Sequence, residues 1–176
     1  MNLTIRKAEF GDEHQISEIY EKIHTEEEQG RASIGWQRGV YPTIKTAELG
    51  IEKGEMFVAE DENGRIVAAA RLNDVQCPQY AEAVWTYFVP EDEVFVMHTL
   101  VVDPEVQGNS VGRQMLDFYE NYAGSIGRRY LRIDTNERNK VARAFYTKYG
   151  YSEVDIVLGE FNGMQGISLV CLEKKI

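Results

Sequence analysis

Apolar and polar positions along this chain follow two periods, which predict helices alternating with strands. In residues 12–28 the apolar side chains recur at the spacing of one helical face. A second helical segment begins at Thr43 and ends at Gly54. Strand-like segments at 56–60 and 65–72 flank an Asn-Gly turn, which favours a hairpin. The buried face of the first helix is predicted to consist of Ile16, Ile19, Tyr20 and Ile23.

The second half of the chain predicts a strand, a helix and a further strand. Residues 94–102 are apolar on both faces, which is typical of a strand covered from both sides. A polar turn, an amphipathic helix from Val111 and a strand at 130–135 follow, all within about 40 residues, which requires parallel neighbours and a right-handed crossover. A helix at 139–149 and two antiparallel strands, at 151–157 and 166–172, complete the order.

Two connections lack a clear period. Residues 29–42 are rich in glycine but carry Trp36 and Tyr41, which must either pack under the loop or line a cavity. Residues 73–92 hold further aromatic side chains and are typical of an insertion or a flexible arm at the sheet edge. Trp36 and Tyr41 are therefore candidates for the wall of a substrate site, with simple packing as the alternative.

Composition limits the function classes. The chain of 176 residues suits a single domain, residues 1–176, and its 43% of hydrophobic residues is ordinary for a globular protein. It has no apolar run of about 18 residues and no apolar signal core at the N-terminus, so we expect a cytoplasmic protein with no membrane partner. The net charge of −10 argues against nucleic acid as a partner. The two cysteines and three histidines show no metal-ligand spacing, so no metal is expected.

The charge is unevenly distributed. Acidic residues gather at 12–28, and basic residues gather at 128–148. A basic segment inside an acidic protein suits a small polyanionic ligand, while the acidic helix and the aromatic loop suit a small cationic amine. Either cluster is equally compatible with a solvated helix face.

The junction between strand 94–102 and the next helix carries a chemical signal. Gly108 and Gly112 let a ligand approach the backbone closely. A helix that begins there directs unpaired N–H groups and its positive dipole end at the turn. This arrangement favours a phosphate or pyrophosphate site.

Two motifs resemble the GNAT superfamily of acyl-CoA-dependent N-acetyltransferases. Residues 107–112, Gln-Gly-Asn-Ser-Val-Gly, resemble that family's pyrophosphate loop, Gln/Arg-x-x-Gly-x-Gly/Ala. Residues 139–151 resemble its Asn…Ala…Phe-Tyr…Gly-Phe/Tyr helix. The resemblance covers essentially the whole order of elements. It implies a single-domain α/β fold with a mixed, mostly antiparallel central sheet, a parallel βαβ acyl-CoA-binding core and helices on both faces.

The resemblance also implies chemical roles. Acetyl-CoA would be the acyl donor and a small-molecule amine the acceptor. Tyr146 would be the general acid, because a phenol stays protonated at neutral pH. His98 is a candidate general base, with Glu93, Asp134 or a water chain as alternatives. The residues implied to bind the donor are Leu100, Val101, Val102, Gln107, Gly108, Asn109, Ser110, Val111, Gly112, Arg113, Asn139, Ala142, Tyr146 and Lys148.

Ser110 departs from the family pattern, which has glycine at that position. We expect Ser110 to adopt a helical conformation, with its hydroxyl donating to a phosphate or capping the helix. The rival function is a non-catalytic acyl-CoA-binding sensor or interaction module, which would not need Tyr146. A nucleotide-binding domain is disfavoured because the chain lacks its glycine motifs. The aromatic residues at 73–92 and the C-terminal strand suggest a homodimer.

Overall fold

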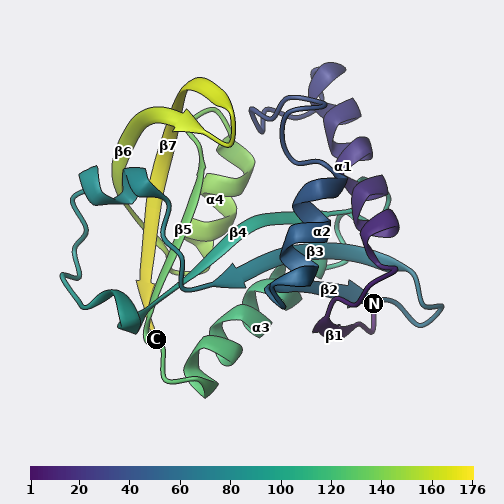
Figure 1. Cartoon of the computed structure of the whole chain (residues 1–176), viewed down its shortest axis with the longest axis horizontal. Coiled ribbons are helices and arrows are strands. Elements are labelled where there is room, and N and C mark those ends of the chain that lie inside the picture. Colours follow the sequence, from purple (N-terminus) through teal and green to yellow (C-terminus); the bar gives the residue numbers. More distant parts are fainter.

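A twisted seven-stranded sheet runs through the molecule in the order β1-β2-β3-β4-β5-β7-β6 (Figure 1). The computed structural model describes residues 1–176. The strands are β1 (Thr4–Lys7), β2 (Met56–Glu60), β3 (Ile66–Asn73), β4 (Val94–Val102), β5 (Tyr130–Asn136), β6 (Ser152–Phe161) and β7 (Met164–Lys175). Of the six neighbouring pairs, only β4–β5 is parallel.

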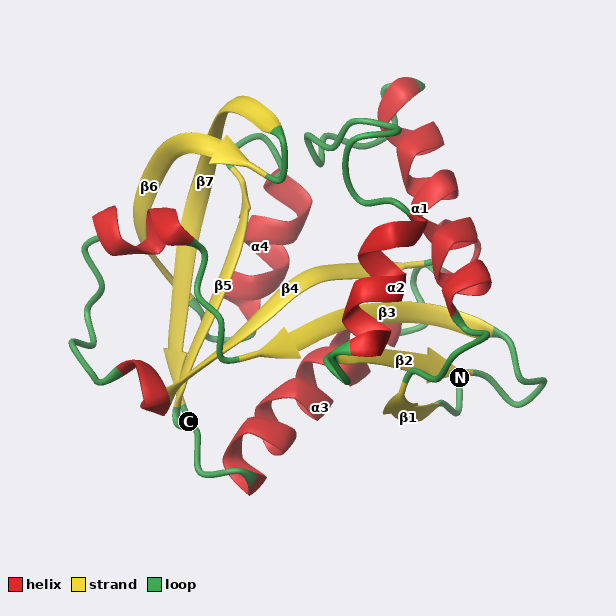
Figure 2. Ribbon diagram, in the orientation of Figure 1, coloured by secondary structure: helices red, strands yellow, loops and turns green.

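Helices cover both faces of the sheet (Figure 2). They are α1 (Glu13–Glu28), α2 (Ile44–Glu52), α3 (Val111–Ser125) and α4 (Lys140–Lys148). Helices α1 and α2 pack on one face, and α3 packs on the other together with Tyr146 of α4. The predicted fold class, a mostly antiparallel mixed sheet with one parallel βαβ unit and helices on both faces, is confirmed.

The spacing of apolar residues predicted the helices correctly because each helix buries a continuous face. The predicted inner face of α1 is buried in full, and α3 buries Val111, Met115 and Tyr119. The last two strands are longer than predicted, since they extend to the turn at Asn162 and Gly163. Near this turn, apolar and polar residues alternate only weakly along the two strands, because many of the side chains there are exposed.

The segment at 73–92 is not a flexible arm at the sheet edge, as the sequence suggested. It lies across the sheet face opposite α3 and forms a hydrophobic cluster with β4, β6 and β7. Tyr80 is buried there, and its hydroxyl donates to Asp134 at 2.7 Å. The ring of Trp85 stacks on the guanidinium of Arg132 at 3.9 Å. These contacts join residues far apart in sequence, which no local period reports.

Strands β4 and β5 separate after a short parallel seam. Their register pairs Val94 with Tyr130 and ends where Met97 meets Ile133. Beyond that point the two strands diverge (Figure 1). Residues 98–102 of β4 and 134–136 of β5 no longer pair with each other, although they still pair with β3 and β7. We call these two segments the β4–β5 split. At the split β4 also carries a bulge, with Thr99 at a φ of 53°.

Candidate functional site

The predicted pyrophosphate loop presents a row of free backbone donors. Gly108 has a φ of 87°, and a side chain at that position would meet only open space. The first helical bond of α3 runs from Gln114 N–H to the Ser110 carbonyl. The N–H groups of Gly108 and of residues 110–113 therefore donate to no acceptor in the protein. Free donors at a helix start are what an anionic oxygen requires.

The expected conformation of Ser110 is wrong. Its φ of 59° and ψ of 20° lie in the left-handed region, and its hydroxyl does not cap α3. The chain changes direction between Gly108 and the first turn of α3. This change requires a left-handed backbone conformation at Ser110, which glycine adopts more easily than any other residue. The serine N–H remains free, so the strained residue keeps the donor that an anion needs.

The end of β4 offers further backbone groups to the split. Asp103 N–H bonds to the Val67 carbonyl, so alternation directs the groups of Val101 toward β3 as well. By the same alternation the N–H and C=O groups of Leu100 and Val102 point toward the β4–β5 split. Of the three candidate residues on this strand, Val101 is thus engaged within the sheet, while Leu100 and Val102 face the split.

Helix α4 brings two predicted residues to the same region. Asn139 is its N-cap, with Oδ1 accepting from Ala142 N–H at 3.1 Å. The side-chain nitrogen Nδ2 of Asn139 makes no hydrogen bond in the protein. Tyr146 is 6% exposed. Its hydroxyl has no partner and, unlike that of Tyr151, is not fully enclosed. Burial, with the Asp134 charge adding to it, raises the pKa of Tyr146 and keeps the phenol protonated.

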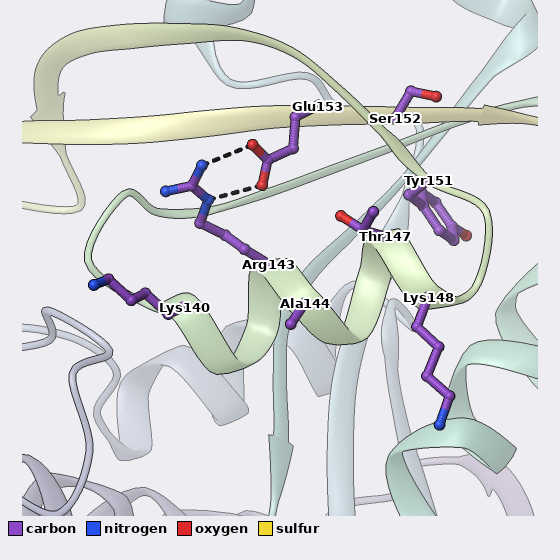
Figure 3. A pocket seen from close by; sticks show the side chains of 8 residues that line it. All are labelled: Lys140, Arg143, Ala144, Thr147, Lys148, Tyr151, Ser152 and Glu153. Atoms are coloured by element: carbon purple, nitrogen blue, oxygen red, sulfur yellow. Dashed lines mark hydrogen bonds and ion pairs between the residues drawn. The ribbon is translucent and has the colours of Figure 1, made fainter.

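Lys148 of α4 and Arg113 of α3 both lie close to the Tyr149 ring. The guanidinium of Arg113 is 4.1 Å and the ammonium of Lys148 5.6 Å from the ring centroid. Lys148 points toward α3, away from the paired Arg143 and Glu153 (Figure 3). The open hollow drawn there lies along α4 and the start of β6, and Lys148 is the one residue predicted to bind the donor that lines it.

The candidate bases are now distinguished by position. Glu93 is exposed at the start of β4, several residues before the split. His98 and Asp134 are the first residues beyond the last parallel pair, one on each strand. Burial lowers the pKa of His98, although the charge of Asp134 opposes this shift. Burial also raises the pKa of Asp134, against the effect of the hydrogen bond from Tyr80.

The aromatic loop between α1 and α2 reaches the split. The Tyr41 hydroxyl hydrogen-bonds to the Thr99 hydroxyl at the β4 bulge, and burial raises the pKa of Tyr41 to about 12. Trp36 meets Tyr41 edge to face at 6.0 Å and also packs on the core beneath α1. A side chain at Gly35 would collide with Asn136 at the end of β5. The loop therefore lies over the open end of the split.

The acidic residues of α1 have a different role from the one their charge suggested. Glu21 and Glu28 both bind Arg38, and Glu26 binds Arg31, so these carboxylates hold the loop at 29–42. Three residues of the basic segment, Arg128, Arg138 and Arg143, also form ion pairs. Lys148 takes part in no ion pair and lies near the Tyr149 ring.

Sequence reasoning missed Asn73 and Tyr80, which contact the two candidate bases. Asn73 Oδ1 lies 3.0 Å from His98 Nε2, and Tyr80 donates to Asp134. Asn73 ends the apolar strand β3 and is only 6% exposed. A polar residue closing an apolar strand was the available signal, although its partner depends on the β3–β4 register.

No group of three or more histidine, cysteine, aspartate or glutamate side chains is placed to hold a metal ion. None of the helices is both long enough and apolar enough to cross a membrane.

Two relatives resemble this chain, one along most of its length and one along less than half of it. An uncharacterized N-acetyltransferase of Bacillus subtilis is 23% identical over 151 residues, covering 86% of this chain and 91% of that protein. An uncharacterized N-acetyltransferase of Methanocaldococcus jannaschii is 31% identical over 75 residues, covering 43% of this chain. That match spans only 33% of the archaeal protein.

Solved structures share the fold. A GNAT-family acetyltransferase of Streptococcus agalactiae superposes with a TM-score of 0.80 at 20% identity, covering 99% of this chain and 95% of that one. A GNAT-superfamily phosphinothricin acetyltransferase of Sinorhizobium meliloti, solved in complex with acetyl-CoA, gives 0.71 at 16% identity, covering 100% and 89%. Residues 14–151 match the Acetyltransferase (GNAT) family. The chain therefore belongs to the GNAT family of acetyltransferases.

Proposed function

We propose that this protein transfers an acetyl group from acetyl-CoA to a primary amine of a small molecule by direct attack. The observation that carries the proposal is the convergence of free backbone donors at the α3 start with a protonated Tyr146 hydroxyl that makes no hydrogen bond within the protein. Relatives named N-acetyltransferases and a structural neighbour solved with acetyl-CoA support it.

The residues present fit acetyl-CoA. The N–H groups of Gly108 and of residues 110–113 would hold the diphosphate. The outward backbone groups of Leu100 and Val102, with the Asn139 amide, would hold the pantetheine arm. Lys148 would meet a phosphate of the nucleotide end. When bound, the donor supplies an acetyl group activated as a thioester.

Two side chains would move protons. The amine must be neutral to attack, and His98 offers an uncharged imidazole at neutral pH, since burial lowers its pKa. The Tyr146 hydroxyl would donate its proton to the departing thiolate. Asp134, near both groups, raises the basicity of His98 through its charge.

The acceptor would enter beneath the loop that carries Trp36 and Tyr41. Their rings provide aromatic surface, which suits a cationic amine. Because the carboxylates of Glu21 and Glu28 hold the loop, the preference for a cation rests on this aromatic surface rather than on α1.

The test is release of free thiol from acetyl-CoA in the presence of a panel of amines, amino acids and aminoglycosides. Acceptor-dependent release, with an acetylated amine identified by mass spectrometry, is the expected result. Calorimetric binding of CoA without release for any acceptor would instead favour a non-catalytic acyl-CoA sensor. Failure to bind CoA would contradict both functions.

A further inference from the structure

Two oxygen atoms that act as hydrogen-bond acceptors contact Nε2 of the His98 imidazole. His98 Nε2 lies 3.0 Å from the Val75 carbonyl oxygen and 3.0 Å from Asn73 Oδ1. A backbone carbonyl can only accept, so Nε2 must carry the proton. The other nitrogen, Nδ1, has no partner in the protein and, unlike Nδ1 of the buried His24, remains accessible.

The orientation of the Asn73 amide is also determined by its neighbours. Its nitrogen donates to Glu55 Oε2 at 2.9 Å, and its oxygen accepts from Val75 N–H at 3.1 Å. Glu55 Oε2 also accepts from Arg71 Nε at 2.7 Å. Because a carboxylate only accepts and an N–H only donates, the reversed amide would oppose both contacts. The oxygen of Asn73 therefore faces the imidazole.

We propose that Asn73, anchored by Glu55, is a positioning residue that fixes His98 as the Nε2–H tautomer and leaves Nδ1 bare to accept the proton of the acceptor amine. The inference rests on the proposed function and adds to it the identity of the basic nitrogen. In the transfer, the amine N–H proton moves to the Nδ1 lone pair, and the resulting imidazolium later releases it to solvent. Asn73 touches neither acceptor nor donor.

Three charged groups face His98 and set its basicity. Burial has the largest effect and lowers the pKa of His98; against it, Asp134 on β5 and Glu55 before β2 favour the imidazolium, whereas Arg71 on β3 disfavours it. Asn73 is neutral, so it orients the ring without adding charge. Moving the carboxylate of Glu55 to the position of Asn73 would keep the net charge and would reverse the hydrogen bond between the two side chains, with the new glutamine as the donor. It would also remove the carboxylate that pairs with Arg71 at position 55, and it would place the negative charge against Nε2–H.

The decisive variant is this exchange, Glu55→Gln combined with Asn73→Asp. A carboxylate against Nε2–H stabilises the imidazolium, so the pKa of His98 should rise by about one unit. The probe is the His98 Cε1–H resonance in a pH titration, assigned by its loss in His98→Gln. The acidic limb of the kcat/KM profile should move with it, while the KM for acetyl-CoA stays within twofold. Asn63→Asp, the same substitution in the exposed β2–β3 turn, should move neither quantity.

An unshifted His98 resonance in the folded double variant would overturn the inference, as would an acidic limb that ignores a shifted resonance. If the variant does not fold, the unmodified protein still decides the question. Long-range proton–nitrogen spectra above the pKa should show a protonated Nε2 and a bare Nδ1, and a protonated Nδ1 would refute the proposal. These spectra need no turnover, so failure of the transferase proposal remains distinguishable from failure of this one.

Discussion

Two residues beside the β4–β5 split hold a backbone conformation that side chains disfavour. Thr99 and Ser110 have φ values of 53° and 59°. Thr99 is β-branched, for which this region is a genuine outlier, and its hydroxyl bonds to Tyr41. Strained residues of this kind gather at functional sites because the surrounding structure can hold them there. The two outliers border the segment that offers its free backbone groups to a ligand.

At Ser110 the strain is measurable. Ser110→Gly should raise the free energy of unfolding by about 1 kcal/mol, because glycine adopts a positive φ without steric cost. The affinity for acetyl-CoA should stay within a few-fold, since the N–H is retained. Urea unfolding and calorimetry measure the two quantities. A loss of stability on this substitution would contradict the left-handed conformation.

The Tyr146 hydroxyl provides a second prediction. Tyr146→Phe should lower turnover at least about tenfold, because the departing thiolate loses its proton donor, while CoA still binds. Steady-state kinetics and calorimetry test this, with Tyr122→Phe on α3 as a control that removes a phenol without a proposed role. An unchanged rate would remove Tyr146 from the acid role.

Among the elements, the loop at 29–42 is held by exposed ion pairs in addition to the packing of Trp36 and Tyr41. Arg38 joins Glu21 and Glu28 of α1 to the part of the loop that leads to Tyr41. These side chains are well exposed, so their pairing adds little to global stability. Their effect is to hold Tyr41 over the split.

Arg38→Gln should therefore change the free energy of unfolding by less than about 1 kcal/mol, yet raise the KM for the acceptor several-fold. The KM for acetyl-CoA should not change. Arg31→Gln is the matched control, because Arg31 lies on the same loop but pairs with Glu26 near the end of α1. Equal effects of the two variants on the acceptor KM would argue against this role of Arg38.

Sequence patterns predicted the elements with continuous buried faces and the loop that follows β4. They failed where long-range contacts decide the structure. Tyr80 and Asn73 acquire their partners only when strands distant in sequence align, so no local period marks them. The conformation of Ser110 was mispredicted because a helix start and a chain reversal compete at one residue, and the reversal prevailed.

For the molecule as a whole, buried carboxylates set the response to acid. Asp103 is 1% exposed, and burial alone would raise its pKa. Hydrogen bonds from Lys22, Glu105 N–H and Arg65 instead hold the pKa of Asp103 below its ordinary value. A lowered folded-state pKa gives stability that is present above the unfolded value near 4 and is lost as the pH falls through the folded value.

Asp103→Asn should accordingly destabilise the protein at pH 7 by about 2 kcal/mol, the scale of hydrogen bonds to a charged group. The difference from the unmodified protein should shrink as the pH falls below about 4, where the aspartate also becomes protonated. Urea unfolding across this range measures the change. A difference independent of pH would show that the carboxylate charge is not what stabilises the fold.

The short seam between β4 and β5 has a mechanical consequence. Four residue pairs, from Val94–Tyr130 to Met97–Ile133, are the only strand pairing between the first four strands and the last three. The sheet thus consists of two halves, β1–β4 and β5–β7, that are joined only by this short pairing. A ligand bound between the two halves would hold them together. At a hundredfold excess over its Kd, acetyl-CoA should stabilise the fold by about 2.7 kcal/mol. Amide hydrogen exchange should slow most at residues 94–97 and 130–133, because the bound ligand opposes separation of the two halves of the sheet.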